Sequence, residues 1–139
     1  MRPEEVLLVV YRPPGPEFLV LLRSPERDGY WNLVAGGVEE GEEPSAAALR
    51  ELREESGLAD PARFEELPLE LGYVRPEGMR VAMHAFLAAA PAGWEPVLDE
   101  EHVDYRWCSR EEADHLLAYP EPREAVRWVA RRLQEEEQA

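Results

Sequence analysis

The sequence is poor in several residue types, and each shortage excludes something. The single cysteine, Cys108, cannot form an internal disulfide framework, which fits a reducing cytosol as the expected location. This cysteine is expected to be buried in a strand rather than to act as a nucleophile. No apolar run is long enough to span a bilayer, and acidic residues precede the first apolar run, so the sequence predicts neither a transmembrane helix nor a secretory signal. Lysine, isoleucine and threonine are absent, which indicates a GC-rich genome and says nothing about function.

Positive charge is also scarce. The chain has 15 basic residues, all of them arginine, against 30 acidic ones, and its net charge is −15. This balance argues against a nucleic-acid polymer and against an anionic membrane surface as partners. An anionic small molecule would need metal ions and some of the arginines around it. With 139 residues and 45% apolar content, the chain is expected to form one globular domain, residues 1–139, with a real core.

Strand and helix patterns are mixed along the chain. Two apolar runs flank a proline-rich turn and are expected to pair as antiparallel strands, and a second such pair flanks Pro76-Glu77-Gly78. Ser109 and Glu112 form a capping box before one helix, and an apolar stripe marks another. The predicted strands cover residues 6–11, 18–22, 69–75, 80–88 and 103–108, and the predicted helices cover residues 45–56, 110–118 and 121–136. This arrangement predicts an α/β/α sandwich.

The most informative segment, residues 36–58, places four glutamates and one arginine around a single predicted helix. We call it the glutamate box. Its fixed positions are Gly36, Glu42, Arg50-Glu51-Leu52, Glu54-Glu55 and Gly57-Leu58. This chain's own residue frequencies would produce that register by accident with a probability on the order of 10⁻⁵. Pro44 suits the first helical turn and Gly57 a left-handed cap, so the box is expected to form a loop, a helix and a turn.

The spacing of the glutamates predicts a site for a divalent cation. Glu51, Glu54 and Glu55 are three or four residues apart, which brings their carboxylates to one face of the helix. Three like charges near a helix C-terminus repel one another and oppose the helix dipole, and a cation would offset this. Mg²⁺ or Mn²⁺ prefers such oxygen ligands. Arg50 is expected to pair with Glu54 one turn later and to orient it, and the glycines before the helix leave the backbone open to an anion or a metal.

The glutamate box resembles, without substitution, the motif of the Nudix hydrolase superfamily. The resemblance implies an α/β/α sandwich with a mixed central sheet and a hydrolase that cleaves a nucleoside diphosphate linked to another moiety, with Mg²⁺ or Mn²⁺. It implies Glu51, Glu54 and Glu55 as metal ligands, with one of them or a neighbouring carboxylate as the base, and Arg50 as the residue that orients Glu51. The backbone of Gly36 is expected to add a ligand oxygen. Val34-Ala35 replaces the Pro-Gly of many members, which places Ala35 in the loop beside the substrate.

Other segments resemble particular branches of that superfamily. Residues 30–42, 101–107 and 120–125 look like the dihydroneopterin triphosphate pyrophosphatase branch, and residues 101–107 are also similar to asymmetric diadenosine tetraphosphate hydrolases. In both branches a glutamate at the position of Glu101 is a further metal ligand or base. Arg2 and Arg23 fall where the first branch has basic residues near the substrate. A homodimer is common among such relatives.

Several alternatives remain open at this point. A nucleoside or pterin triphosphate is the first choice of substrate, followed by a dinucleoside polyphosphate and then by ADP-ribose. A catalytically silent module that binds a nucleotide is the rival from another class, although such modules usually lose box glutamates. Trp31, Tyr73 and Trp94 are candidates to stack on a base or pterin. His84 is expected to be structural, whereas His102 suits a structural role or metal ligation equally.

Overall fold

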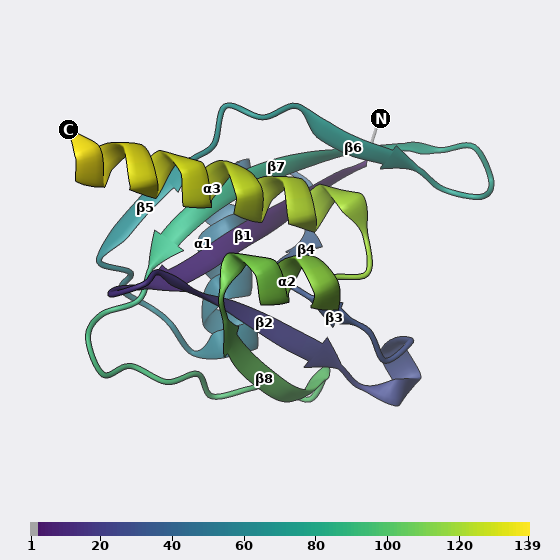
Figure 1. Cartoon of the computed structure of the whole chain (residues 1–139). Coiled ribbons are helices and arrows are strands. Elements are labelled where there is room, and N and C mark those ends of the chain that lie inside the picture. The colour runs from purple at the N-terminus through teal and green to yellow at the C-terminus, as the bar shows by residue number, and fades with distance from the viewer. Residues whose placement is uncertain (1–2) are drawn as a thin grey trace.

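The computed structural model describes residues 3–139 and confirms the predicted α/β/α sandwich (Figure 1). A mixed sheet of eight strands lies between helix α1 on one face and helices α2 and α3 on the other. The strands are β1 (Glu4–Arg12), β2 (Glu17–Arg23), β3 (Trp31–Asn32), β4 (Val34–Gly37), β5 (Arg63–Glu66), β6 (Leu71–Val74), β7 (Arg80–Ala89) and β8 (His102–Cys108). The helices are α1 (Pro44–Ser56), α2 (Arg110–Leu116) and α3 (Pro120–Gln138), and a short 3₁₀ turn, η1, covers Pro25–Arg27.

Strand β1 organises the sheet because it is buried over residues 6–11 and paired along both edges. Strand β7 runs parallel to it over Glu4–Tyr11, while β2 and β4 share its other edge as antiparallel partners. Strand β8 extends the sheet beyond β2, and β5 and β6 pair with β7. Side chains alternate between the two faces of β1, so that Leu7 and Val9 pack under α2 and α3, whereas Val6 and Leu8 pack under α1. This division yields one core on each face of the sheet.

The start of the glutamate box corrects one sequence prediction. Residues 34–37 were expected to form a loop, but they form strand β4, which pairs with Glu5–Leu8 of β1. Glycines are weak strand formers, and the pairing with a central strand supplies hydrogen bonds that no local pattern reveals. Strand β4 therefore aligns the backbone at Ala35 and Gly36 with the helix that follows.

Helix α1 begins and ends where the sequence predicts. Pro44 occupies its first turn, and Gly57 ends it with a φ of 82° while its N–H donates to the carbonyl of Arg53. Ala47, Ala48 and Leu52 are buried against the sheet. Leu49, on the same helix, is 37% exposed. The buried face of α1 fixes the opposite face, and with it the box glutamates, in relation to β4.

The C-terminal part of the chain contains Cys108 and the two helices α2 and α3. Ser109 accepts a hydrogen bond from the N–H of Glu112, and the capping box predicted for α2 is present. Helix α2 ends at Leu116, two residues before the predicted boundary, and α3 extends through Gln138. Cys108 is buried, and burial raises the pKa of its thiol to about 11. None of the helices in residues 3–139 combines the length and apolar character needed to cross a membrane.

Candidate active site

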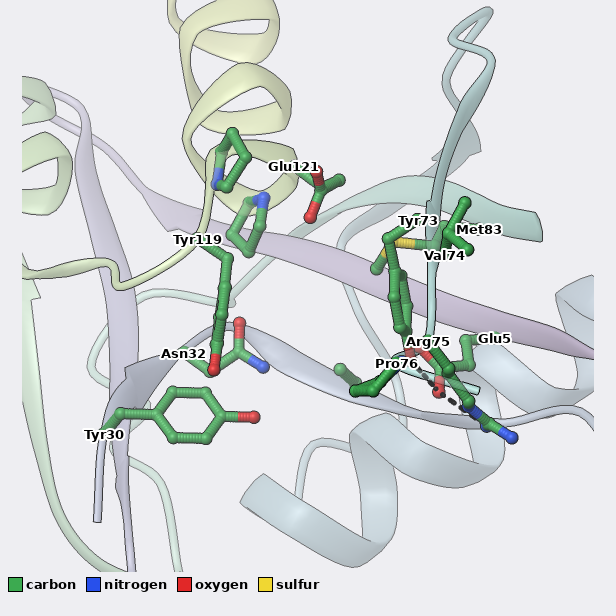
Figure 2. A pocket seen from close by; sticks show the side chains of 13 residues that line it. Glu5, Tyr30, Asn32, Tyr73, Val74, Arg75, Pro76, Met83, Tyr119 and Glu121 are labelled. Carbon is green, nitrogen blue, oxygen red and sulfur yellow. Dashed lines mark hydrogen bonds and ion pairs between the residues drawn. The ribbon is translucent and has the colours of Figure 1, made fainter. Parts of the chain in front are cut away.

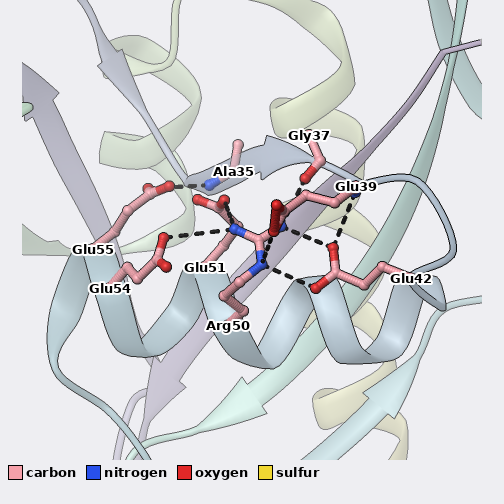
Figure 3. Close-up of polar contacts among 8 residues, drawn as sticks. All are labelled: Ala35, Gly37, Glu39, Glu42, Arg50, Glu51, Glu54 and Glu55. Atoms are coloured by element: carbon pink, nitrogen blue, oxygen red, sulfur yellow. Dashed lines mark hydrogen bonds and ion pairs between the residues drawn. The ribbon is translucent and has the colours of Figure 1, made fainter.

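Arg50 is the hub of the glutamate box (Figure 3). Its guanidinium donates to both carboxylate oxygens of Glu42 at 2.9 Å, to the carbonyl of Gly37 at 2.9 Å and to Oε1 of Glu51 at 2.5 Å. The hydrogen bonds from Arg50, with one from the N–H of Glu39, lower the pKa of Glu42 to about 2. The predicted pair with Glu54 is present but longer, at 3.6 Å. Arg50 therefore ties the loop before α1 to the carboxylate of Glu51.

Glu55 is a buried carboxyl group with few partners. Its side chain is 4% exposed, and its Oε1 accepts a hydrogen bond of 3.3 Å from the N–H of Ala35 on β4. Burial, followed by a hydrogen bond to Glu51 and the charge of Glu51, raises the pKa of Glu55 far above its ordinary value. Two carboxyl groups in contact away from water require a proton or a cation between them. The pair of Glu51 and Glu55 thus has the character of a cation site.

Gly36 leaves room for the carboxylate of Glu51. A Cβ at position 36 would meet the carboxylate carbon and both oxygens of Glu51 within 2.6 Å. By contrast, a Cβ at Gly37 or Gly41 would meet nothing within 4 Å. Among Gly36, Gly37 and Gly41, which precede α1, Gly36 is therefore the one whose missing side chain makes room for a carboxylate. Its strand position brings the backbone of β4 directly against the acidic face of α1.

The donor set suits a hard divalent cation. Glu51 and Glu54 lie on the face of α1 near Glu55, and Glu54 is 54% exposed. Within residues 3–139 no group of three metal-binding side chains is arranged to hold a cation. The carboxylate of Glu51 binds Arg50, and that of Glu55 accepts the N–H of Ala35. Glu51 and Glu55 nevertheless remain in contact with each other, and a cation bound there would relieve the repulsion between their carboxylates. The oxygen donors thus fit a hard divalent cation.

Glu101 and Arg23, which were also predicted for the site, have other partners in this structure. Glu101 forms an ion pair of 2.8 Å with Arg27, so in this structure its carboxylate is turned toward a different partner. Arg23 donates to the carbonyl of Arg27, and its guanidinium lies 5.2 Å from the ring centre of Tyr30. Arg2 lies outside the described residues. The loop that ends at Glu101 does reach the box, but through its neighbour His102, whose Nε2 is 3.7 Å from Oε1 of Glu55.

A pocket of about 550 Å³ adjoins the glutamate box (Figure 2). Tyr30 and Tyr119 lie on one side of it and Tyr73 on the other. Ala35 lines the pocket while its N–H contacts Glu55, so the pocket and the box meet at β4. The other residues that line it are Glu5, Asn32, Val74, Arg75, Pro76, Met83, Pro120, Glu121 and Pro122.

Only part of this pocket was found by sequence reasoning. Tyr73 was a candidate to stack on a heterocycle, and it lines the pocket. Trp94, a second candidate, packs edge-on against Trp107 with ring centres 6.3 Å apart, and Trp31 packs against the core beneath α2 and α3. Tyr30 and Tyr119, whose rings meet edge-on at 5.2 Å, were missed. The two tyrosines are distant from each other in the sequence. Tyr30 is the first residue of segment 30–42 and Tyr119 precedes segment 120–125, but neither position indicates that their rings meet.

The chain matches a family model described as the NUDIX domain over residues 1–129. It is 33% identical to the asymmetrical bis(5′-nucleosyl)-tetraphosphatase of Mus musculus, over 76% of this chain and 72% of that protein. It is 29% identical to the dihydroneopterin triphosphate diphosphatase of Haemophilus influenzae, over 89% of this chain and 85% of that protein. A Caenorhabditis elegans Ap4A hydrolase in a binary complex superposes with a TM-score of 0.81 at 27% identity, over 95% of this chain and 98% of that one.

Coverage differs among the relatives. The chain is also 34% identical to an octanoyltransferase of Myxococcus xanthus. The match covers 88% of this chain but only 35% of that longer protein. The similarity to that relative therefore concerns one segment of a longer protein.

Proposed function

This chain belongs to the Nudix hydrolase family, and on that premise we propose that it hydrolyses a phosphoanhydride bond in the triphosphate of a flat nitrogen heterocycle. The observation that supports this most is the tyrosine-lined pocket joined to the glutamate box at Ala35. A heterocycle held between Tyr73 and Tyr119 would place its phosphate chain along β4, toward Glu51 and Glu55. Arg75 lines the same pocket and supplies a positive charge suited to a phosphate chain.

The polar groups of the pocket favour one class of heterocycle. Oδ1 of Asn32 already accepts the N–H of Leu33 at 2.8 Å, so its amide NH₂ is left to donate to a carbonyl. Glu5 and Glu121 also line the pocket, and a carboxylate can accept N–H groups. Glu5 already accepts the hydroxyl of Tyr73 at 2.9 Å. A pterin and a guanine each carry a carbonyl beside an N–H and an amino group, whereas adenine has no carbonyl. The substrate we propose is therefore dihydroneopterin triphosphate or a guanosine triphosphate.

Glu51, Glu54 and Glu55 are the residues proposed to hold the cation. When bound, a divalent cation would neutralise phosphate charge and lower the pKa of a water molecule. Arg50 holds Glu51 in place, and Glu54, whose closest pairing to Arg50 is 3.6 Å, is the box carboxylate most open to accept a proton from water. The oxygen of water bonds to phosphorus, the P–O bond to the leaving phosphate breaks, and the leaving group takes a proton from solvent.

The test is release of phosphate and pyrophosphate in the presence of Mg²⁺ or Mn²⁺ over a panel of candidate substrates. The panel contains dihydroneopterin triphosphate, dGTP, dATP, oxidised dNTPs, diadenosine tetraphosphate and ADP-ribose. We expect the first two to exceed dATP by about tenfold or more in kcat/KM. Preference for diadenosine tetraphosphate would move the assignment to dinucleoside polyphosphates. Metal-dependent nucleotide binding without turnover of any member would identify a sensor instead.

Removal of Tyr119 is expected to weaken substrate binding without slowing the chemical step. Tyr119→Leu takes away one aromatic wall of the pocket, and base stacking on an aromatic ring is worth about 1–3 kcal/mol. We expect KM to rise by roughly tenfold while kcat stays close to that of the wild type. Tyr105→Leu is the matched control, because Tyr105 lies on β8 and its hydroxyl bonds to Glu95, outside the pocket. Equal KM values for both variants would remove Tyr119 from the substrate site.

A further inference from the structure

A buried imidazole connects the glutamate box to the loop that precedes β8. His102 is the first residue of β8, and its side chain is 1% exposed. Its Nδ1 lies 2.7 Å from Oδ1 of Asp99, and its Nε2 lies 3.7 Å from Oε1 of Glu55. Because a carboxylate only accepts hydrogen bonds, Nδ1 carries the hydrogen and donates it to Asp99. The ring is thereby fixed with its Nε2 edge toward Glu55.

The position of Asp99 is itself fixed by the loop. Its Oδ1 also accepts the N–H of Glu101 at 3.2 Å. The carbonyl of Glu101 accepts the N–H of Ser24 at 2.8 Å, and the N–H of Val97 donates to the carbonyl of Ser56 at 2.8 Å. The loop is thus attached both to β2 and to the end of α1. An Asp99 held in this way can orient the imidazole in the way that carboxylates orient histidines at metal sites.

Two contacts converge on one oxygen of Glu55. The N–H of Ala35 on β4 reaches Oε1 at 3.3 Å, and Nε2 of His102 on β8 faces the same atom at 3.7 Å. Groups from two different strands therefore limit rotation of the carboxylate about its last bond. Rotation decides which oxygen Glu55 presents toward Glu51 and the acidic face of α1.

We propose that His102, oriented by Asp99, is a positioning residue that fixes the carboxylate of Glu55 for binding a divalent cation. This inference rests on the proposed function, since it assigns Glu55 a cation to bind. It gives His102 a role through Glu55 rather than direct contact with the substrate. The Asp99 contact alone would explain a histidine that only holds the loop, so the two ring nitrogens must be tested separately.

Two substitutions separate the two edges of the ring. In His102→Asn the side-chain amide reaches the place of Nδ1, which keeps the bond to Asp99 and removes the edge that faces Glu55. In His102→Gln the amide reaches the place of Nε2, which keeps a polar group at Glu55 and loses the bond to Asp99. Mn²⁺ affinity, measured from the electron paramagnetic resonance signal of the free ion, reports on the site without substrate. We expect His102→Asn to bind Mn²⁺ about 10- to 100-fold more weakly than the wild type, and His102→Gln to lose less.

His84 provides a matched control. Its Nε2 lies 3.1 Å from Glu4 and its Nδ1 lies 3.8 Å from Glu66, so it is also an imidazole between two carboxylates, but on β7 and 27% exposed. His84→Asn is expected to leave Mn²⁺ affinity unchanged. If His102→Asn does not fold, as judged by its melting curve, Asp99→Ala replaces it, because loss of the Nδ1 acceptor frees the ring. A several-fold weaker Mn²⁺ affinity is then expected.

The outcomes distinguish this inference from the proposed function. Wild-type protein that binds Mn²⁺, together with a His102→Asn variant of equal affinity, would overturn the positioning role and leave the proposed function standing. A weaker Mn²⁺ affinity for His102→Gln than for His102→Asn would overturn it as well. The contact of the ring with Asp99 would then be the one that determines cation binding. Wild-type protein that binds no Mn²⁺ would overturn both. As a second readout, we expect His102→Asn to lower kcat while KM for the substrate changes little, since the tyrosine-lined pocket is intact.

Discussion

Glu55→Gln is expected to raise the melting temperature of the metal-free protein and at the same time to reduce turnover by roughly 10²- to 10⁴-fold. The first effect follows from burial, which raises the pKa of Glu55 far above its ordinary value of about 4.5. The folded protein then binds a proton at neutral pH that the unfolded chain releases. Stability therefore falls as the pH rises above the unfolded pKa, and it continues to fall until the pH reaches the folded pKa.

Glutamine does not titrate and has the shape of a protonated glutamate. In the wild type, keeping this proton in the folded state lowers the free energy of unfolding at pH 7 by at most about 3 kcal/mol. The variant does not lose this stability. The measurement is the melting temperature of both proteins in EDTA from pH 5 to pH 9, and the difference should widen toward high pH, reaching on the order of 10 °C or more. Added Mn²⁺ should stabilise the wild type more than the variant, because a cation replaces the proton between Glu51 and Glu55.

Glu54→Gln is the companion variant for this prediction. Glu54 is 54% exposed, so the same chemical change relieves no buried carboxyl group and should leave the metal-free melting temperature close to that of the wild type. Turnover should nevertheless fall by a similar factor, because Glu54 is the carboxylate proposed to accept a proton. Near-wild-type turnover in both variants would exclude the glutamate box as the catalytic centre. A difference in melting temperature between the wild type and Glu55→Gln that stays the same from pH 5 to pH 9 would exclude the buried, protonated carboxyl group.

The features that the sequence predicted well are those determined by local spacing. The cap residues Pro44 and Gly57 define α1, and the spacing of Glu51, Glu54 and Glu55 brings them to one helix face. Both depend on helical geometry, which needs no knowledge of distant residues. The three-layer architecture follows from the alternation of apolar runs and helical stripes.

The features that the sequence did not predict depend on pairing across the fold. The pairing of Arg50 with Glu42 was not expected, and it forms because β4 and the loop after it fold back over the helix. The pair expected with Glu54 is longer, at 3.6 Å. Strand β4 forms because residues 34–37 pair with residues 5–8 of β1. The tyrosine-lined pocket and the contact of Asp99 with His102 bring together strands and loops from separate parts of the chain. Local sequence patterns do not predict such contacts between residues that are distant in the chain.

Gly36→Ala is expected to reduce turnover by about 10²-fold while leaving the melting temperature close to that of the wild type. Gly36 lies in an extended strand paired with Val6, so the backbone can accept an alanine there. The new Cβ would meet the carboxylate of Glu51 within 2.6 Å, and the carboxylate must move. Because that group is the flexible end of a side chain, it can rotate away at little cost to folding. It then leaves both Arg50 and the position beside Glu55.

Gly37→Ala is a stringent control for this substitution, because it makes the same chemical change at the next residue of the same strand. A Cβ at position 37 would meet nothing within 4 Å, and the carbonyl of Gly37 would still accept its hydrogen bond from Arg50. Turnover and Mn²⁺ affinity of this variant should therefore equal those of the wild type, whereas Gly36→Ala should lose both. Equal activity in the two variants would mean that the present position of the Glu51 carboxylate is not the one that hydrolysis requires. A loss confined to Gly36→Ala would show that the close approach of β4 to α1 is itself a part of the site.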